Sequence, residues 1–144
     1  MIFLISLAIG FNDSSNFYVS ERVLMEQKGS VFLKDREEAR KYLNKIFKDE
    51  WFKRNFKINK PMLIESNRPD WAYSVLGGSV GKIAVPNSGI WNWCILHEVA
   101  HHITPHDNHG KNFAKVELLL IEHFLNPSAA ESLRKSFNKN KIKF

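Results

Sequence analysis

The histidine-rich segment HEVAHHITPHDNHGKNF, residues 97–113, restricts the possible folds of this chain more than any other part of the sequence. It contains five of the six histidines. His97, Glu98 and His101 form an HExxH pattern, and residues four apart lie one turn from each other on the same face of a helix. The surrounding residues, WCILHEVAHHI, are mostly apolar. The pattern therefore predicts a helix over 91–104 that buries its flanks and holds two imidazoles side by side.

Two imidazoles one helical turn apart can bind the same zinc ion, at about 2.0–2.1 Å for each Zn–N bond. Glu98 directly follows the first imidazole, so its carboxylate is poorly placed as a ligand. It can instead reach a water molecule on the ion and act as a general base. The alternative explanation is a histidine-rich helix end, because histidines favour helix C-termini. Since unpartnered imidazoles on a buried face would cost stability, we favour a site for one Zn²⁺ ion.

A catalytic zinc ion needs a third protein ligand and an open position for water. We expect His109 to be this ligand, because the turn after the helix is long enough to return the chain toward it and Gly110 permits a tight backbone. Glu117 and Glu122, on the next predicted helix, remain alternatives. Four other residues are candidates for stabilising an oxyanion or orienting a ligand: Tyr73, His102, His106 and Asp107.

Two helices are predicted in the first third of the chain. A polar cluster, NDSSN, starts the first helix, which continues through FYVSERVLMEQKG, where Phe17, Val23 and Leu24 can share one helical face. Asp35, three residues before Glu38, has the form of a capping box and starts the second helix, over 36–52. The stretch SVFL between them predicts a short strand.

Strand patterns come next, and helices complete the chain. KPMLIES predicts a strand, and WAYSVL followed by GGSVG and KIAVP predicts a β-hairpin around a glycine-rich connection. Further helices are predicted over 111–125 and from Pro127 onward, since proline suits the first turn of a helix. This order indicates an α+β fold. We expect a single domain over residues 1–144, with a small mixed or antiparallel sheet packed on the HExxH helix and a helical C-terminal half.

The two ends of the chain have different compositions. Residues 1–13 begin with MIFLISLAIGF, an apolar run of eleven residues that is too short to span a bilayer and lacks the basic start of a signal peptide. We expect this N-terminal extension to pack on the domain, with no membrane partner. Residues 138–144 form a basic tail, which is expected to be solvated.

Composition excludes several classes of protein. With 44% hydrophobic and 12% aromatic residues, the 144-residue chain can build a core, so intrinsic disorder is not expected. The single cysteine, Cys94, excludes a disulfide framework and a cysteine-based zinc site, and it fits a reducing, cytoplasmic location. We expect its thiol to be a core residue. The net charge of +6 favours an acidic partner, with nucleic acid as a weaker alternative.

Over residues 82–113 the chain resembles a family of small zinc metallohydrolases and metallopeptidases, many of them phage-encoded. In that family an IAVP-like strand precedes LHExAHH, a proline-containing loop and HGxxF, and this chain reads KIAVPNSGIWNWCILHEVAHHITPHDNHGKNF. FYVSERVL near the start is similar too, so the likeness extends over about residues 17–137. The pattern also resembles SprT-like and minigluzincin-like peptidase domains.

This resemblance implies a zincin-like fold, zinc bound by His97, His101 and His109, and Glu98 as the base. SprT-like proteins often carry a zinc ribbon after the peptidase domain. The single cysteine leaves no such ribbon here, which puts their DNA-linked role in doubt for this chain.

Together, the motif and the resemblance predict a zinc metallopeptidase acting on a protein or peptide, in the cytoplasm or, if the chain is phage-encoded, in the host cytoplasm. An edge strand beside the motif helix could bind the peptide as an added strand, and WAYSVL or GKIAVP would supply that edge. The alternative is a non-catalytic binding module of the same fold that contacts a protein or nucleic acid.

Overall fold

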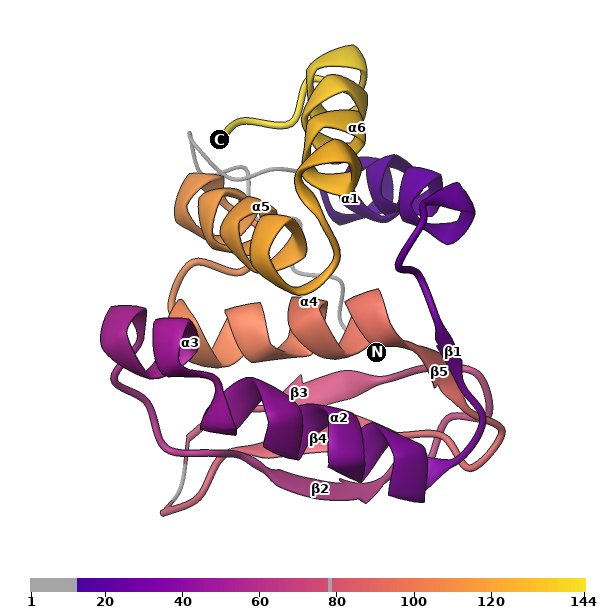
Figure 1. The fold of residues 1–144 in the computed structure, drawn as a ribbon, viewed down its shortest axis with the longest axis vertical. Coiled ribbons are helices and arrows are strands. Elements are labelled where there is room, and N and C mark those ends of the chain that lie inside the picture. The colour runs from indigo at the N-terminus through magenta and orange to yellow at the C-terminus, as the bar shows by residue number, and fades with distance from the viewer. Residues whose placement is uncertain (1–12, 78) are drawn as a thin grey trace.

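The computed structural model describes residues 13–77 and 79–144, and the helix with the HExxH pattern lies at the centre of the fold (Figure 1). The chain is a mixture of helices and short strands, as predicted. The helices are α1 (Ser14–Glu21), the 3₁₀ helix η1 (Arg22–Glu26), α2 (Arg36–Lys48), α3 (Glu50–Asn55), α4 (Asn92–Ile103), α5 (Lys111–Phe124) and α6 (Pro127–Lys139). The strands are β1 (Phe32–Leu33), β2 (Met62–Glu65), β3 (Tyr73–Val75), β4 (Lys82–Val85) and β5 (Ile90–Trp91).

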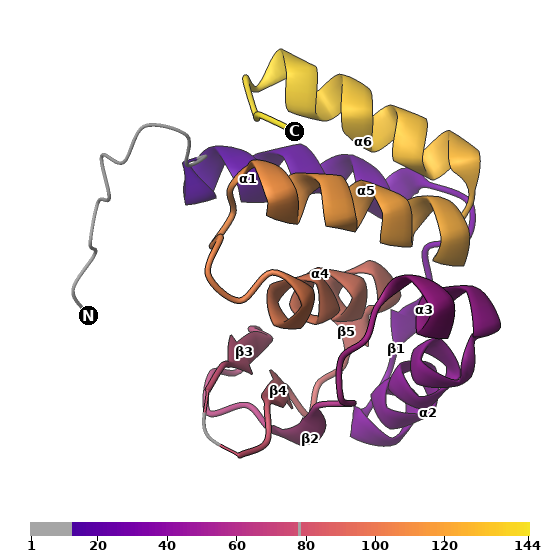
Figure 2. The ribbon, with the colours of Figure 1, turned by 90° about the vertical axis from the view of Figure 1, so that its left-hand side faces the viewer.

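A three-stranded mixed sheet in the order β2-β4-β3 lies on one side of α4 (Figure 2). β2 pairs with β4 in parallel, and β3 pairs with β4 antiparallel, with Tyr73 opposite Ala84. The predicted hairpin is therefore confirmed. Because β4 is hydrogen-bonded on both sides, the prediction that GKIAVP could be an edge strand is wrong. β3, from the WAYSVL segment, is an edge of this sheet.

The other side of α4 is covered by a layer of α1, α5 and α6, while α2 and α3 lie beside the sheet (Figure 2). Phe17 of α1 is fully buried in this layer, and its ring contacts Phe113 of α5 and Phe137 of α6 at centroid distances of 5.3 and 5.0 Å. Leu24, in η1, is also fully buried. The predicted inner face of the first helix is confirmed, although its second half winds as a 3₁₀ helix.

The predicted helix over 36–52 is interrupted at Asp49, so its continuity is a wrong prediction. Asp35 does start α2, and its carboxylate accepts a hydrogen bond from the Glu38 backbone N–H at 2.9 Å. Asp49 has an extended backbone and its carboxylate accepts a bond from Phe52 N–H at 2.8 Å, which begins α3. An aspartate in this conformation satisfies an unpaired N–H of a new helix, and this stabilises the break.

The basic tail is not a solvated segment, contrary to the expectation for residues 138–144. Helix α6 continues to Lys139, and Ile142 beyond it is 5% exposed. Ile142 N–H donates to the Phe137 carbonyl at 2.8 Å, and the Phe144 ring packs 5.8 Å from that of Phe137. Apolar side chains interleaved with the lysines therefore hold the tail on the core.

Two further predictions concern the membrane and the N-terminus. Among the residues that the structure describes, no helix is long and apolar enough to cross a membrane. The predicted packing of the apolar segment 1–13 falls almost wholly on residues 1–12, which lie outside the described part of the chain.

Candidate metal centre

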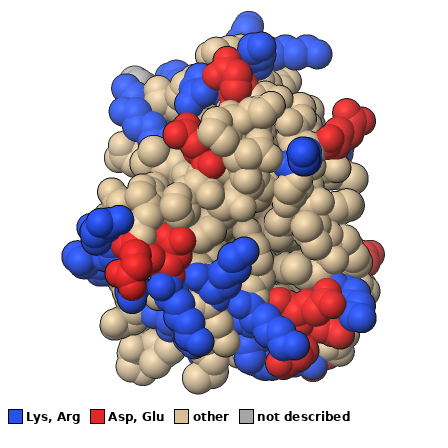
Figure 3. Space-filling view, viewed as in Figure 1, with Lys and Arg blue, Asp and Glu red and all other residues tan. Residues whose placement is uncertain are grey.

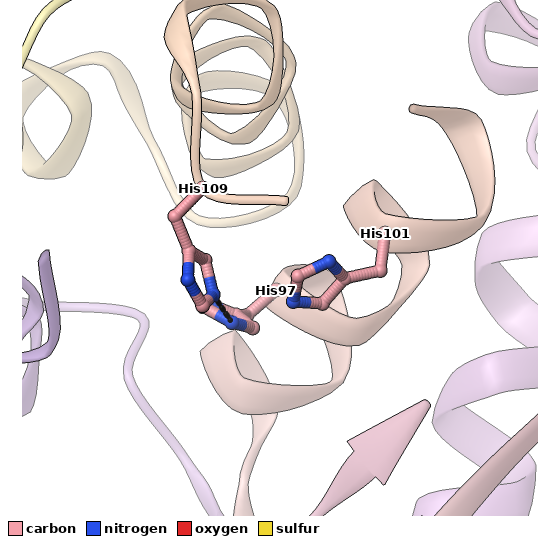
Figure 4. Close-up of side chains that lie close together, drawn as sticks. All are labelled: His97, His101 and His109. Atoms are coloured by element: carbon pink, nitrogen blue, oxygen red, sulfur yellow. Dashed lines mark hydrogen bonds between the residues drawn. The ribbon is translucent and has the colours of Figure 1, made fainter. Parts of the chain in front are cut away.

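Three histidines converge at the interface between α4 and the start of α5 (Figure 4). His97 and His101 come from successive turns of α4, and His109 comes from the loop that leads into α5. One ring nitrogen from each lies within 4.8 Å of the others, and Nε2 of His97 is 3.2 Å from Nε2 of His109. The three side chains could therefore hold a metal ion, as the HExxH pattern predicted.

The geometry fits a shared ion. Two nitrogen ligands of a tetrahedral zinc ion with bonds of 2.0–2.1 Å lie about 3.3 Å apart. The distance of 3.2 Å between the two Nε2 atoms is close to this value. His97 Nδ1 lies 2.6 Å from Glu21 Oε2, and His109 Nδ1 lies 3.1 Å from Ser14 Oγ. When each Nδ1 carries the proton, the two Nε2 lone pairs face each other, and a cation between them relieves the repulsion.

Burial keeps two of the imidazoles neutral. Burial lowers the pKa of His101 to about 2 and that of His109 to about 3, and the nearby His97 adds to both effects. A neutral imidazole has the free lone pair that metal binding requires. Three imidazole nitrogen donors suit zinc, and also copper, iron or nickel, so the donor set restricts the metal without identifying it.

Two buried carboxylates lie on the opposite edge of the His97 ring from Nε2. Glu21 is 2% exposed and Glu117 is fully buried, and Glu117 Oε2 lies 3.4 Å from His97 Nδ1. Neither Glu117 oxygen has a hydrogen-bond partner among the described residues. Burial lowers the pKa of His97, but the two carboxylates outweigh this and raise it well above its usual value. Burial and Glu117 likewise raise the pKa of Glu21.

This arrangement favours one of the predicted third ligands. Glu117 faces the Nδ1 edge of His97, away from the space that the three histidines share, and Glu122 is exposed on α5. His109, by contrast, is 7% exposed and points into that space. The geometry therefore favours His109 over both glutamates. Glu21, Glu117 and His97 also form a second group whose ligand atoms lie close enough together to hold a metal.

Glu98 lies beside the histidine cluster in a nearly buried position. The residue is 6% exposed, and its Oε2 is 3.9 Å from His97 Nε2. Ser74, on the edge strand β3, donates a hydrogen bond to Glu98 Oε1 at 3.1 Å. Burial raises the pKa of Glu98 above its usual value. Glu98 is therefore held by the sheet next to the three histidines, in the position expected for a general base.

Two of the four auxiliary candidates interact with the sheet. Tyr73 donates from its hydroxyl to Asn67 Oδ1 at 3.1 Å, and it points to the opposite face of β3 from Ser74 because side chains alternate along a strand. His102 Nε2 lies 3.1 Å from the Lys82 carbonyl oxygen. The Tyr73 hydroxyl is therefore bound to the segment after β2, and His102 links α4 to β4.

The other two candidates lie in the turn between α4 and α5. His106 is exposed there. Asp107 accepts a hydrogen bond from Phe113 N–H at 2.8 Å, and a Cβ on Gly110 would come within 2.7 Å of its carboxylate. Asp107 therefore shapes the loop that carries His109. Glycine is needed at position 110 because the Asp107 carboxylate packs against its Cα, and not because its backbone angles require glycine.

Helix α1 contributes residues that the sequence did not identify. Tyr18 stacks on His97 at a centroid distance of 5.6 Å and meets His109 edge-on at 5.2 Å. Tyr18 and Glu21 are three residues apart, so they share one face of the helix. The one available signal was the segment FYVSERVL, which contains both residues, but its resemblance pointed to no role for either.

A cavity of about 420 Å³ opens beside His97 and Glu98. Its walls come from α1, from the segment before β3, and from the start of α4. The lining residues are Tyr18, Glu21, Arg22, Asp70, Trp71, Ala72, Ile90, Trp93, Cys94, His97 and Glu98. A ligand in this space would contact Glu98 and His97 together.

Comparison with known proteins gives no match. No family model, no curated protein and no solved structure matches this chain.

Proposed function

We propose that this protein is a zinc-dependent metallopeptidase with a zincin-like fold. The observation that carries the proposal is the convergence of His97, His101 and His109 around one space, with the Glu98 carboxylate 3.9 Å from His97 Nε2. Three imidazoles and a neighbouring glutamate are the parts needed for hydrolysis assisted by a metal ion. The single cysteine is compatible with a cytoplasmic site of action.

His97, His101 and His109 would hold the zinc ion, which would supply a Lewis acid and lower the pKa of a water molecule from 15.7 to about 7. Glu98 would accept the proton of the attacking water at its carboxylate and would later donate it to the amine that leaves. Ser74 holds the Glu98 side chain in position through the bond to Oε1. Glu21 orients His97 by accepting a hydrogen bond from its Nδ1, as carboxylates do for many metal-bound histidines.

The Tyr18 hydroxyl is our candidate for stabilising the oxyanion, in place of Tyr73. Tyr18 lines the cavity next to Glu98 and stacks on His97. Burial raises its pKa to about 12, so the hydroxyl keeps its proton at neutral pH and can donate a hydrogen bond. Tyr73 already donates to Asn67 on the other face of the strand.

The substrate backbone binds along β3 in this proposal. β3 is an edge of the sheet, and Ser74 at its centre contacts Glu98 (Figure 2). An extended peptide added to this edge would pass directly over the general base. The net charge of +6 favours acidic substrates, although on the face in Figure 3 acidic side chains lie among the lysines and arginines. Such mixing gives less support to a nucleic-acid surface, which needs clustered positive charge.

The first test is the zinc content of the purified protein, measured by elemental mass spectrometry, together with hydrolysis of a fluorescently labelled denatured protein. We expect about one zinc ion per chain. Glu98→Gln should retain zinc and reduce kcat by about 10²–10⁴-fold, the usual contribution of a general base. Glu122→Gln, an exposed position on α5, is the matched control and should change neither quantity.

The outcomes separate the alternatives. A folded protein that takes up no zinc would refute the metallopeptidase. Stoichiometric zinc without hydrolysis of any peptide would instead indicate the non-catalytic binding module. Full activity of Glu98→Gln would remove this residue from the mechanism.

A further inference from the structure

We propose that the cavity beside His97 and Glu98 binds a large apolar side chain of the substrate, aromatic or branched aliphatic, from a residue adjoining the scissile bond. This inference rests on the proposed peptidase function and adds the substrate class to it. Two observations support it: the cavity wall is mostly apolar, and His97 and Glu98 of the candidate metal centre are part of that wall.

Most of the cavity wall is apolar. Two tryptophans, a tyrosine and an isoleucine contribute to it, and its volume of about 420 Å³ lies within the usual range of about 300–1,000 Å³ for ligand pockets. Tyr18 and Trp71 are 39% and 50% exposed, and their rings meet edge-on at a centroid distance of 5.9 Å. Large aromatic side chains left this exposed can pack against an incoming ring or branched chain without rearranging the core.

The proposed reacting groups belong to the same wall. His97 and Glu98 line the cavity, so a peptide carbonyl held at Glu98 would lie beside it. Trp71 and Ala72, which also line it, directly precede β3, so a peptide added to that strand would lie close to the cavity. Side chains of an extended peptide alternate between its two faces. One side chain next to the scissile bond therefore points into the cavity, while its immediate neighbours point away.

Charge also restricts what the cavity accepts. Glu21 and Glu98 lie in its wall and are 2% and 6% exposed, so an acidic side chain there would lose its hydration next to two buried carboxyl groups. Arg22 and Asp70 also line the cavity, are exposed to solvent, and can bind polar groups of the substrate backbone. If acidic residues are favoured in the substrate, they are favoured away from this position.

Cleavage of a mixed peptide library, with the products sequenced by mass spectrometry, tests the proposal directly. We expect Phe, Tyr, Trp, Leu or Ile at one position next to the cleaved bond, at least fivefold over Ala and with Asp and Glu depleted. Trp71→Ala should reduce this preference at least threefold, and Ala72→Phe, which fills the cavity, should shift it toward small residues. Leu119→Ala, an equally exposed apolar position on α5, is the control and should leave the profile unchanged.

A second measurement does not depend on catalysis. ¹⁵N-labelled protein, with and without zinc, is titrated with N-acetyl-phenylalanine amide and with N-acetyl-alanine amide. We expect the phenylalanine probe to shift the indole N–H signals of Trp71 and Trp93, whereas the alanine probe has a much smaller effect. Trp51 and Trp91 do not line the cavity and are internal controls.

The two measurements distinguish failure of this inference from failure of the peptidase proposal. Cleavage without an apolar preference, or a preference that survives both Trp71→Ala and Ala72→Phe, would overturn the pocket and leave the peptidase intact. Absence of cleavage together with specific indole shifts would overturn the peptidase and support an apolar binding pocket. Equal shifts with both probes, or no shift with either, would overturn the pocket in every case.

Discussion

Replacing Glu21 by glutamine gives the most informative test of how the centre is built. The Glu21 carboxylate is 2% exposed and accepts a hydrogen bond from His97 Nδ1 at 2.6 Å. Glutamine has nearly the same size and retains an oxygen acceptor, but it lacks the negative charge. The substitution therefore isolates the electrostatic contribution of this carboxylate to zinc binding.

The structure predicts opposite effects on metal affinity and on the stability of the metal-free protein. Bonds to a charged acceptor are about twice as strong as neutral ones, and loss of such a partner from a ligating histidine typically weakens metal binding 10–100-fold. We therefore expect the zinc dissociation constant of Glu21→Gln to rise by about 10–100-fold, or about 1.4–2.7 kcal/mol. Without metal, Glu21 and Glu117 are two acidic groups buried beside the same imidazole, so replacing one by an amide that cannot ionise should leave the stability unchanged or higher.

The pH dependence of the metal-free protein follows from the same pair. Burial and the nearby Glu117 hold the pKa of Glu21 well above its usual value of 4.5. The folded state then retains a proton that the unfolded state releases, so the free energy of unfolding decreases as the pH rises above about 4.5. This decrease should be smaller in Glu21→Gln than in the wild type.

Zinc affinity is measured by competition with a chromophoric chelator at pH 7.5, and stability by urea unfolding of the metal-free protein. Glu26→Gln, an exposed position in η1, the 3₁₀ helix that follows α1, is the matched control and should resemble the wild type in both assays. Zinc binding by Glu21→Gln within twofold of the control would refute the orienting role. A metal-free variant much less stable than the control would refute the reasoning about the buried charges.

Three further predictions address single side chains. His109→Ala should lose most of the bound zinc, while His106→Ala on the exposed turn should retain about one equivalent. The zinc content of dialysed samples is measured by elemental mass spectrometry, and greater loss in His106→Ala than in His109→Ala would contradict the ligand assignment. Tyr18→Phe should lower kcat by about 10²–10³-fold at unchanged zinc content if its hydroxyl donates to the oxyanion, and an unchanged kcat would exclude that role. Burial alone would raise the pKa of Asp49, but hydrogen bonds from His123 and the α3 backbone outweigh it and lower the pKa from 3.8. Asp49 therefore contributes stability that is present above about pH 4 and lost as the pH falls through its lower folded value. The stability advantage of the wild type over Asp49→Asn in urea unfolding should accordingly be seen at pH 5 and shrink toward pH 3, and an advantage that grew below pH 4 would contradict this.

Local features of the sequence predicted many of the elements and half of the site. The HExxH spacing predicted that His97 and His101 share one face of a helix, and both lie on α4. Asp35 and Pro127 begin helices where expected. Each of these features acts through residues at most four positions apart, so it can be recognised without knowledge of the rest of the fold.

The same local reasoning failed where two patterns competed. The apolar periodicity of residues 36–52 continues through Asp49, but the capping bond from Phe52 N–H at 2.8 Å divides the helix there. Tyr73 is a plausible oxyanion donor by residue type, yet strand alternation places it on the opposite face from Ser74. Which face of a short strand meets the motif helix is set by the packing of the sheet, and the strand sequence does not contain that information.

By itself, then, the sequence determined the α+β character, the helix that carries the motif, and the residue types available for metal chemistry. Only the tertiary structure decided that His109 rather than Glu117 faces the shared space, and that Glu21 and Tyr18 belong to the centre. Glu21 lies 76 positions from His97, and Ser14 lies 95 positions from His109. Contacts over such separations depend on how α1 packs against α4 and α5. That packing is a property of the whole core, because each helix can bury its apolar face against several neighbours and only their combined fit selects one arrangement.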